Sequence, residues 1–298
     1  MKNASTHAKL LAVAFIWGLG WVAGRVAARD IPPFTAGWVR YILAVGCFFL
    51  FLFATKQWVT PSRDQWKIIT AIGFLSTFLY QAFFMYGMKW TAAGDASLMI
   101  TFNPLFTAIL AVPFLGEKFD KRLGLGLLSA VCGVAVIAWY SPNVDLPVNE
   151  RLLGDALIAM SALSWACTTI LMKKAMSGEN ALSPLHLTVW SSAVGLLIQT
   201  PAVIWEYSQV GFPMNAGLDA WAWLAFLAIF STVLSYVWFA DGIKIIGAGR
   251  SAMYVYLVPI FGILSGWLLL DEKLGFSLIA SFVLIVGGVY LAQSKELS

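Results

Sequence analysis

Long apolar runs separated by short polar stretches follow one another along the whole chain. Most of these runs reach about 18 residues or more, the length with which an α-helix crosses the hydrocarbon core of a bilayer. The pattern therefore predicts an all-α integral membrane protein with ten transmembrane helices. The predicted spans are residues 9–28, 33–54, 67–88, 93–115, 122–140, 152–176, 184–206, 219–243, 248–270 and 274–293.

A long segment of the first half returns in the second half at a fixed offset of 155 residues. Pro104 aligns in this way with Pro259, and the pair Ser76-Thr77 aligns with Ser231-Thr232. The first and sixth spans also correspond, because Trp17 aligns with Trp165 and Arg25 with Lys173. We interpret the chain as a duplicated unit. Its parts are a first repeat at 1–140, a linker at 141–151 and a second repeat at 152–298.

The loop charges predict the orientation of these repeats. If the N-terminus is cytoplasmic, the inner loops and tails hold thirteen lysines and arginines and the outer loops hold five. The positive-inside rule then places both termini in the cytoplasm. Each half has five spans, an odd number, so the second half must be inverted relative to the first. Inverted repeats in transporters place the substrate site near the membrane midplane, at the interface between the repeats.

Composition supports this class and excludes others. The chain is 60% hydrophobic and 11% charged, with a mean hydropathy of +0.81, whereas soluble domains carry about 25% charged residues. The net charge of +4 comes from residues that do not cluster, so we expect no nucleic-acid partner. Cys47, Cys132 and Cys167 lie inside spans without metal-ligand spacing. We expect no metal, no cofactor and no enzyme activity, because the sequence shows neither a nucleophile–base pattern nor a phosphate-binding loop.

Ionisable residues are scarce in the middle of the predicted spans. Asp95, Asp155, Glu206 and Asp241 all fall near span ends. This position argues against proton-coupled cation export, which calls for a buried carboxylate at depth. Arg40 lies about two turns into the second span. We favour a structural role for it, with the side chain extending outward or bonded to a helix C-terminal carbonyl.

Neutral polar and aromatic residues do occur near the midplane, and as a set they predict an amphipathic, uncharged cavity. Such a cavity suits zwitterionic or uncharged metabolites, and its aromatic faces would also tolerate organic cations. For any single deep aromatic, packing against lipid or another helix is the alternative. The predicted cavity residues are Trp17, Trp21, Tyr80, Gln81, Met99, Thr101, Asn103, Trp165, Thr169, Tyr236, Trp238 and Tyr254.

Two prolines are candidates for hinges. Pro104 and Pro259 fall near the middle of the fourth and ninth predicted spans. A proline inside a helix removes one backbone hydrogen bond and clashes with the carbonyl four residues back, so the freed carbonyl needs a partner or a wet cavity. The alternative is a packing kink. The equivalent placement in both halves favours the hinge.

The repeated motifs resemble those of bacterial drug/metabolite transporters of the EamA type. The first copy reads Arg40-Tyr41, then Gly94-x-Ala96-Ser97-Leu98, Pro104-Leu105 and Phe114-Leu115-Gly116-Glu117. The second copy reads Gly249-x-Ser251-Ala252, Leu257-Val258-Pro259 and Leu270-Asp271-Glu272. The resemblance implies a central cavity walled by spans 1–4 and 6–9, with spans 5 and 10 peripheral. It also implies export of amino acids and other small metabolites, and the aromatic content is similar to that of YddG-type aromatic amino acid exporters.

These observations together predict a secondary transporter in the bacterial inner membrane. We expect it to export small amphipathic metabolites, amino acids including aromatic ones, by alternating access. Its expected partners are a small-molecule substrate and membrane lipid, and we expect it to act as a monomer. The alternatives are proton-coupled efflux of drugs or organic cations, and a flippase for a lipid-linked sugar.

Overall fold

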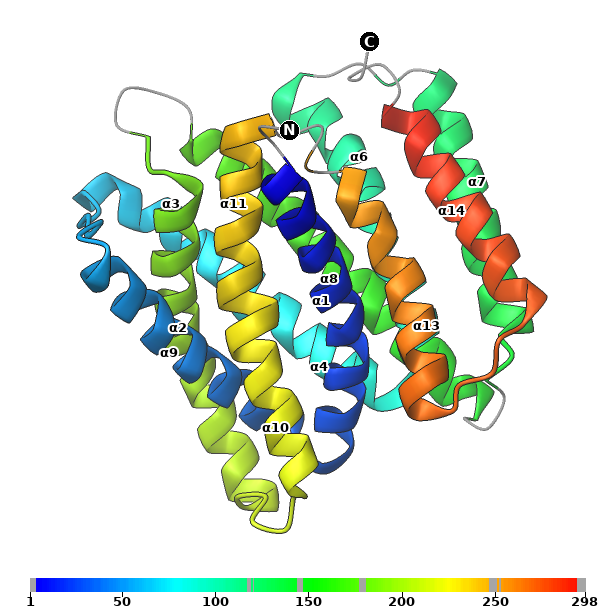
Figure 1. Cartoon of the computed structure of the whole chain (residues 1–298), viewed down its shortest axis with the longest axis horizontal. Coiled ribbons are helices and arrows are strands. Elements are labelled where there is room, and N and C mark those ends of the chain that lie inside the picture. Colours follow the sequence, from blue (N-terminus) through cyan, green and yellow to red (C-terminus); the bar gives the residue numbers. More distant parts are fainter. Residues whose placement is uncertain are drawn as a thin grey trace.

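The computed structural model describes residues 4–116, 119, 121–143, 147–176, 181–246, 251 and 253–293. These residues form a bundle of helices without a strand among them, as predicted (Figure 1). Glu117, Gly249 and Ala252 of the repeated motifs lie outside the described residues. Six helices are continuous. They are α1 (Ala4–Asp30), α2 (Pro33–Ala54), α7 (Lys121–Tyr140), α8 (Val148–Ala175), α9 (Pro184–Val210) and α14 (Phe276–Gln293).

The four remaining spans combine α-helix with a turn of π or 3₁₀ helix. The third span is α3 (Arg63–Gly73), η1 (Phe74–Leu79) and α4 (Tyr80–Trp90), and the fourth is α5 (Ala93–Met99), η2 (Ile100–Phe102) and α6 (Asn103–Leu115). The eighth is α10 (Leu218–Phe226), η3 (Leu227–Leu234) and α11 (Ser235–Ile246). The described part of the ninth includes η4 (Met253–Leu257) and α13 (Val258–Leu270).

Within the described residues, nine of these helical segments are long and apolar enough to cross a membrane. They correspond to the first nine predicted spans. The tenth prediction coincides with α14, whose apolar stretch Phe276–Leu291 is shorter. Large apolar side chains face outward along the bundle; Leu50, Leu197 and Phe276 are 69%, 72% and 83% exposed. Lipid is the solvent in which such a surface is stable.

The irregular turns fall at equivalent places in the two halves. Shifting η1 by the repeat offset of 155 residues gives 229–234, which lies inside the π turn η3, and shifting η2 gives 255–257, which lies inside the 3₁₀ turn η4. Pro104 and Pro259 each occupy the first turn of the helix that follows, α6 and α13. A proline there loses no intrahelical hydrogen bond. The interruption of each span is therefore the 3₁₀ turn before its proline.

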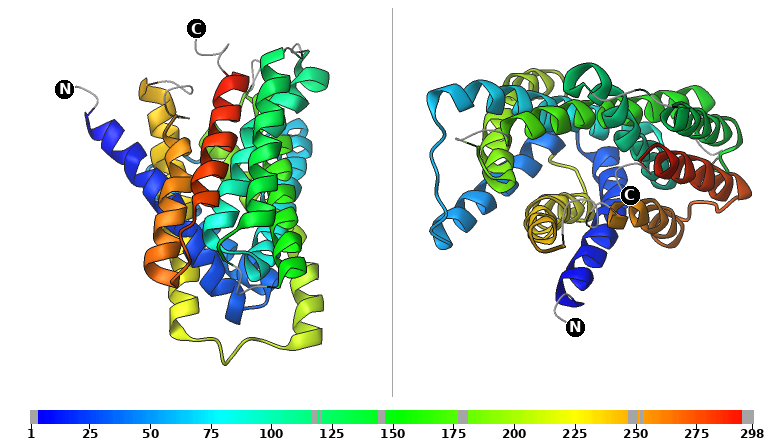
Figure 2. Two further views of the ribbon diagram at one scale, coloured as in Figure 1. Left: turned by 90° about the vertical axis from the view of Figure 1, so that its right-hand side faces the viewer. Right: turned by 90° about the horizontal axis from the view of Figure 1, so that it is seen from above.

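Helix packing repeats when the halves are exchanged. α1 packs against α13, and its counterpart α8 packs against α6. α1 runs down from the upper end of the molecule and α8 runs up toward it (Figure 1). α2 packs against α9, and α7 packs along α14 at one edge of the bundle (Figure 2). The main apolar core runs through both halves and includes residues of α7 and α14; within it Val22, Met85 and Leu98 are fully buried.

Candidate substrate pocket

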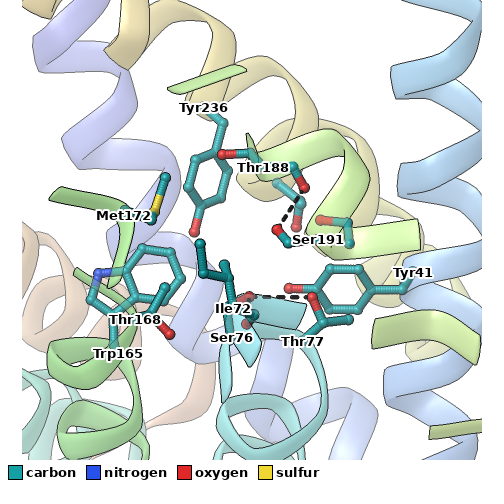
Figure 3. A pocket seen from close by; sticks show the side chains of 12 residues that line it. Tyr41, Ile72, Ser76, Thr77, Trp165, Thr168, Met172, Thr188, Ser191 and Tyr236 are labelled. Carbon is teal, nitrogen blue, oxygen red and sulfur yellow. Dashed lines mark hydrogen bonds between the residues drawn. The ribbon is translucent and has the colours of Figure 1, made fainter. Parts of the chain in front are cut away.

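A pocket lies between the halves, surrounded by α2, α3, η1, α8, α9, η3 and α11 (Figure 3). Several of its residues come from the ends of helices at one end of the bundle. Thr188 follows the start of α9, and Met172 precedes the end of α8. The free volume is about 20 Å³, room for roughly one water molecule. The lining residues are Tyr41, Ile72, Ser76, Thr77, Trp165, Thr168, Met172, Thr188, Ser191, Ser192, Thr232 and Tyr236.

The two π turns bring hydroxyl groups to this pocket. Ser76 and Thr77 come from η1 and Thr232 comes from η3. A π turn widens the helix and shifts its hydrogen bonds to i→i+5, which leaves local polar groups to be satisfied by side chains. The Ser76 hydroxyl donates to Ile72 O at 2.8 Å, and the Thr232 hydroxyl donates to Leu227 O at 2.8 Å. The Ser76 hydroxyl keeps lone pair capacity to accept a further bond, whereas both lone pairs of the Thr232 hydroxyl accept from Arg40.

Aromatic rings form a connected wall beside the hydroxyls. The ring centroids of Tyr80 and Trp165 are 5.4 Å apart, those of Trp165 and Tyr236 are 6.0 Å apart, and those of Tyr236 and Trp17 are 6.0 Å apart. Such tilted contacts are the favoured geometry for aromatic pairs. The wall crosses from the first half to the second, since Trp165 and Tyr236 lie in the second repeat.

The two equivalent tryptophans, Trp17 and Trp165, make different contacts. The Trp17 indole N–H donates to the carbonyl of Ser231 in η3 at 2.9 Å. The equivalent pair in the other half is Trp165 and Ser76, and both residues line the pocket. Figure 3 shows the two side chains on the pocket wall, and among the described residues no hydrogen bond joins the Trp165 indole to Ser76. The pocket therefore occupies a position whose counterpart in the other half is a closed contact.

Arg40 lies directly behind this wall. Its side chain is 7% exposed, and it donates to the Thr232 hydroxyl at 3.2 and 2.9 Å and to Gln81 Oε1 at 3.1 Å. Its guanidinium also lies 5.8 Å from the ring centroids of Tyr41 and Phe84. The predictions that Arg40 extends outward or bonds a helix carbonyl are wrong. The prediction of a cavity without a fixed charge also needs correction, because this cation touches the pocket wall.

The opposite end of the bundle is closed by carboxylates that accept from backbone amides of other helices. Glu272 accepts from the amides of Ala93 and Gly94 at 2.6 and 2.9 Å, and Glu206 accepts from the Thr35 amide at 2.7 Å. Arg25 donates to the carbonyls at the end of α4 at 2.8 and 2.7 Å. Burial raises the pKa of Glu272, although the two amide bonds and the nearby arginines oppose the shift.

A wider hollow of about 350 Å³ lies outside these closing contacts. Lys89, Glu206 and Gln209 line it, together with the loop between α1 and α2. Its walls are charged and its position is at the helix ends, so it has the character of a vestibule. The pocket and this vestibule share no lining residue, so they are separate hollows.

The structure brings several of the predicted cavity residues together. Trp165 and Tyr236 line the pocket, the rings of Tyr80 and Trp17 contact them at tilted angles, and Gln81 binds Arg40.

Other predicted cavity residues have partners away from the pocket. Trp21 is 5% exposed and packs on Phe84, and Met99 is buried on α5 within the apolar core. The Tyr254 hydroxyl bonds the His7 ring at 2.6 Å, near the start of α1. Thr101, Asn103 and Thr169 bond neighbouring groups of their own helical segments, and Trp238 is half-buried on α11.

Sequence reasoning missed most of the hydroxyl residues of the pocket. Ser76, Thr77 and Thr232 could have been identified from the sequence, because the Ser-Thr pair is repeated at the offset of 155. Ser191 and Ser192 lie on α9 opposite these turns. They have no such repeat, so only the packing of α9 against η1 identifies them.

Comparison with known proteins identifies the class of this chain. Over 99% of its length it is 25% identical to the uncharacterized transporter YetK of Bacillus subtilis, and it covers 88% of that protein. It is 27% identical to a probable amino-acid metabolite efflux pump of Escherichia coli, covering 94% of this chain and 92% of the relative. A protein of known crystal structure shares the fold with a TM-score of 0.67 at 16% identity, covering 99% of each chain. The model of the EamA-like transporter family matches residues 5–139 and 152–293, so the chain belongs to the EamA-like transporter family.

Proposed function

We propose that this transporter exports small amphipathic metabolites across the bacterial inner membrane by alternating access. The observation that carries the proposal is the unequal state of the two equivalent tryptophan–serine pairs. Trp17 is bonded to Ser231, whereas Trp165 and Ser76 face the pocket. In a protein with two repeats, exchanging the states of the halves gives a second conformation of similar energy.

In the exchanged conformation, Trp165 would bond the Ser76 carbonyl and Trp17 would leave Ser231. The pocket would then close at the end near Met172 and Thr188 and open at the end now closed by Glu272. We propose that the end near Met172 and Thr188 is the cytoplasmic one, with both termini on that side. Export then proceeds from the present pocket toward the vestibule.

The pocket walls favour a substrate with both apolar and hydrogen-bonding parts. Trp165 and Tyr236 offer aromatic faces, with Tyr80 packed behind Trp165, and Ser76 and Thr77 offer hydroxyls. Neutral amino acids, including aromatic ones, have this combination of groups. One relative named as a probable amino-acid metabolite efflux pump supports the same class. With a free volume of about 20 Å³, the present conformation must open further before such a molecule can enter.

The 3₁₀ turns η2 and η4 are the proposed hinges, each with its proline directly after it. Pro104 and Pro259 fix the first turns of α6 and α13, so bending concentrates in the 3₁₀ turns before them. Replacing Pro104 by Ala should slow turnover more than it reduces the amount of folded protein. Transport equal to wild type by folded Pro104→Ala would refute the hinge.

The test of function is counterflow in proteoliposomes. Purified protein is reconstituted with unlabelled L-phenylalanine inside, and entry of labelled L-phenylalanine is followed with and without a pH gradient. Saturable exchange that L-tryptophan inhibits supports the proposal. Exchange of methyl viologen that depends on the pH gradient, without amino-acid exchange, would refute it in favour of proton-coupled cation efflux.

A further inference from the structure

The guanidinium of Arg40 is a buried cation whose described partners are all neutral. Its side chain is 93% buried, since 7% of it is exposed. The partners are the Thr232 hydroxyl, the Gln81 amide oxygen and the rings of Tyr41 and Phe84. Taking an ion out of water is costly unless an opposite charge or full hydrogen bonding compensates for it. In this conformation the described part of the chain supplies only neutral acceptors.

The hydrogen bonding of this cation is also incomplete. A guanidinium has five N–H donors in a planar fork, and the three bonds to Thr232 and Gln81 use three of them. The fork matches a carboxylate, which can accept two parallel bonds from it.

The amide of Gln81, in the same hydrogen-bond network, also has a donor without a partner. Gln81 is 1% exposed and its Oε1 accepts from Arg40, yet its Nε2 has no hydrogen-bond partner. Reversing the amide would point its N–H group at the cation, so the orientation is fixed by Arg40. A buried amide N–H without an acceptor is destabilising. An anionic oxygen at this place would satisfy both Gln81 and Arg40.

Thr232 connects this network to the pocket. Its hydroxyl accepts from Arg40 and also forms part of the pocket wall. Tyr41, the residue after Arg40, lines the pocket as well. A ligand that enters between Trp165 and Thr232 therefore needs to pass one hydroxyl to reach the guanidinium.

We propose that Arg40, with Thr232 and the Gln81 amide, binds the carboxylate of the transported substrate. The carboxylate replaces Thr232 as acceptor for the Arg40 fork and takes a bond from Gln81 Nε2, while the aromatic wall holds the apolar part. This inference rests on the proposed transport of amphipathic metabolites. It adds that a free carboxylate is required and that a positively charged amine is not.

The same site would couple binding to the conformational exchange. Arg40 lies on α2 of the first half and Thr232 on η3 of the second, so their two hydrogen bonds join the halves. A carboxylate that accepts from the Arg40 guanidinium replaces these hydrogen bonds to Thr232 and so weakens the contact between the halves. The substrate then lowers the barrier between the two conformations, as a transported ligand must.

The test uses four related probes as competitors of labelled L-phenylalanine counterflow. L-phenylalanine and 3-phenylpropionate carry the carboxylate, whereas L-phenylalanine amide and phenethylamine lack it. We expect both carboxylates to inhibit, and both carboxylate-free probes to be at least about tenfold weaker, because each loses charge-assisted bonds to the fork. Equal inhibition by L-phenylalanine and its amide would overturn the inference and leave the proposed transport intact. If labelled L-phenylalanine shows no saturable counterflow at all, the transport proposal on which the inference rests is overturned instead.

Two variants assign the effect to Arg40 itself. Arg40→Gln should bring the inhibition constants of L-phenylalanine and its amide together, and Arg40→Lys should keep the preference for the acid but weaken it. Thermal stabilisation of the purified protein by L-phenylalanine, compared with its amide, gives the same comparison without transport. Thr169→Ser is the matched control, because Thr169 bonds the Trp165 carbonyl and does not touch the network. If the ratio of the inhibition constants of L-phenylalanine and its amide is unchanged in folded Arg40→Gln, the assignment to Arg40 is refuted. If that variant does not fold, the comparison of the four probes on the wild-type protein still tests the inference.

Discussion

The Trp17–Ser231 hydrogen bond should bias the equilibrium between the two conformations. In Trp17→Phe the aromatic ring remains, but the N–H that donates to the Ser231 carbonyl at 2.9 Å is lost. A hydrogen bond of this kind contributes about 1 kcal/mol net. Since about 1.4 kcal/mol corresponds to a factor of ten, the ratio of the present conformation to the exchanged one should fall about fivefold. Trp165→Phe removes the equivalent donor of the exchanged conformation, so it should raise that ratio by a similar factor.

Cysteine accessibility measures this ratio. Thr188 lines the pocket, so Thr188→Cys is introduced after Cys47, Cys132 and Cys167 have been replaced by Ala. The labelling rate with a hydrophilic maleimide reports how often position 188 becomes accessible from the end near Met172, the end that the exchanged conformation would close. We expect the rate to fall in Trp17→Phe and to rise or stay at its maximum in Trp165→Phe.

Opposite effects of the two substitutions are the essential result, because a general loss of packing would act in one direction. If both substitutions slow labelling, or both accelerate it, the exchange of states between the halves is refuted. An unchanged rate in Trp17→Phe would show that the hydrogen bond does not distinguish the two conformations.

Three further substitutions test separate contacts. Burial raises the pKa of Glu272 in the closed contact, so closing this end binds a proton more tightly, and closure should weaken as the pH rises from the ordinary carboxyl range through the raised value. Hydrogen exchange of the Ala93 and Gly94 amides, corrected for intrinsic rates, should accelerate over that range, and Glu272→Gln should abolish the trend. Gly195→Ala would push a methyl group into Thr77 and the Gly73 carbonyl, which should cost about 1–3 kcal/mol of stability and lower the melting temperature. In the control Gly46→Ala the added methyl group meets nothing within 4 Å, so the melting temperature should not fall. Asp271 has φ of 54° at the end of α13, so Asp271→Gly should gain up to about 1 kcal/mol and raise the melting temperature; a lower one would contradict the strain.

The apolar runs were sufficient to predict the helices, because in lipid a spanning segment must satisfy its own backbone hydrogen bonds and a long helix is the simplest solution. The repeat offset of 155 likewise pairs Ser76 with Ser231, and the separate correspondence of the first and sixth spans pairs Trp17 with Trp165. These predictions concern periodicity and alignment, which a single sequence contains.

The pocket was harder to predict, because its geometry depends on which side of each helix faces inward. A π turn rotates the residues after it relative to an ideal α-helix, and helical periodicity alone does not reveal η1 or η3. Arg40 illustrates a second limit. Its position in the span was evident, but its partners Thr232 and Gln81 lie 192 and 41 residues away in the chain. Only the packing of α2 against η3 and against α4 brings them together.

The π turns also make the length of the chain a functional constraint. Deleting one residue from η1 could restore continuous α-helix through the third span, but every residue beyond the deletion would turn by about 100° around the helix axis. Tyr80 and Gln81 would then leave the faces that meet Trp165 and Arg40. In η3 the same change would displace Tyr236. We expect related transporters to vary in the residues of these two segments far more freely than in their number.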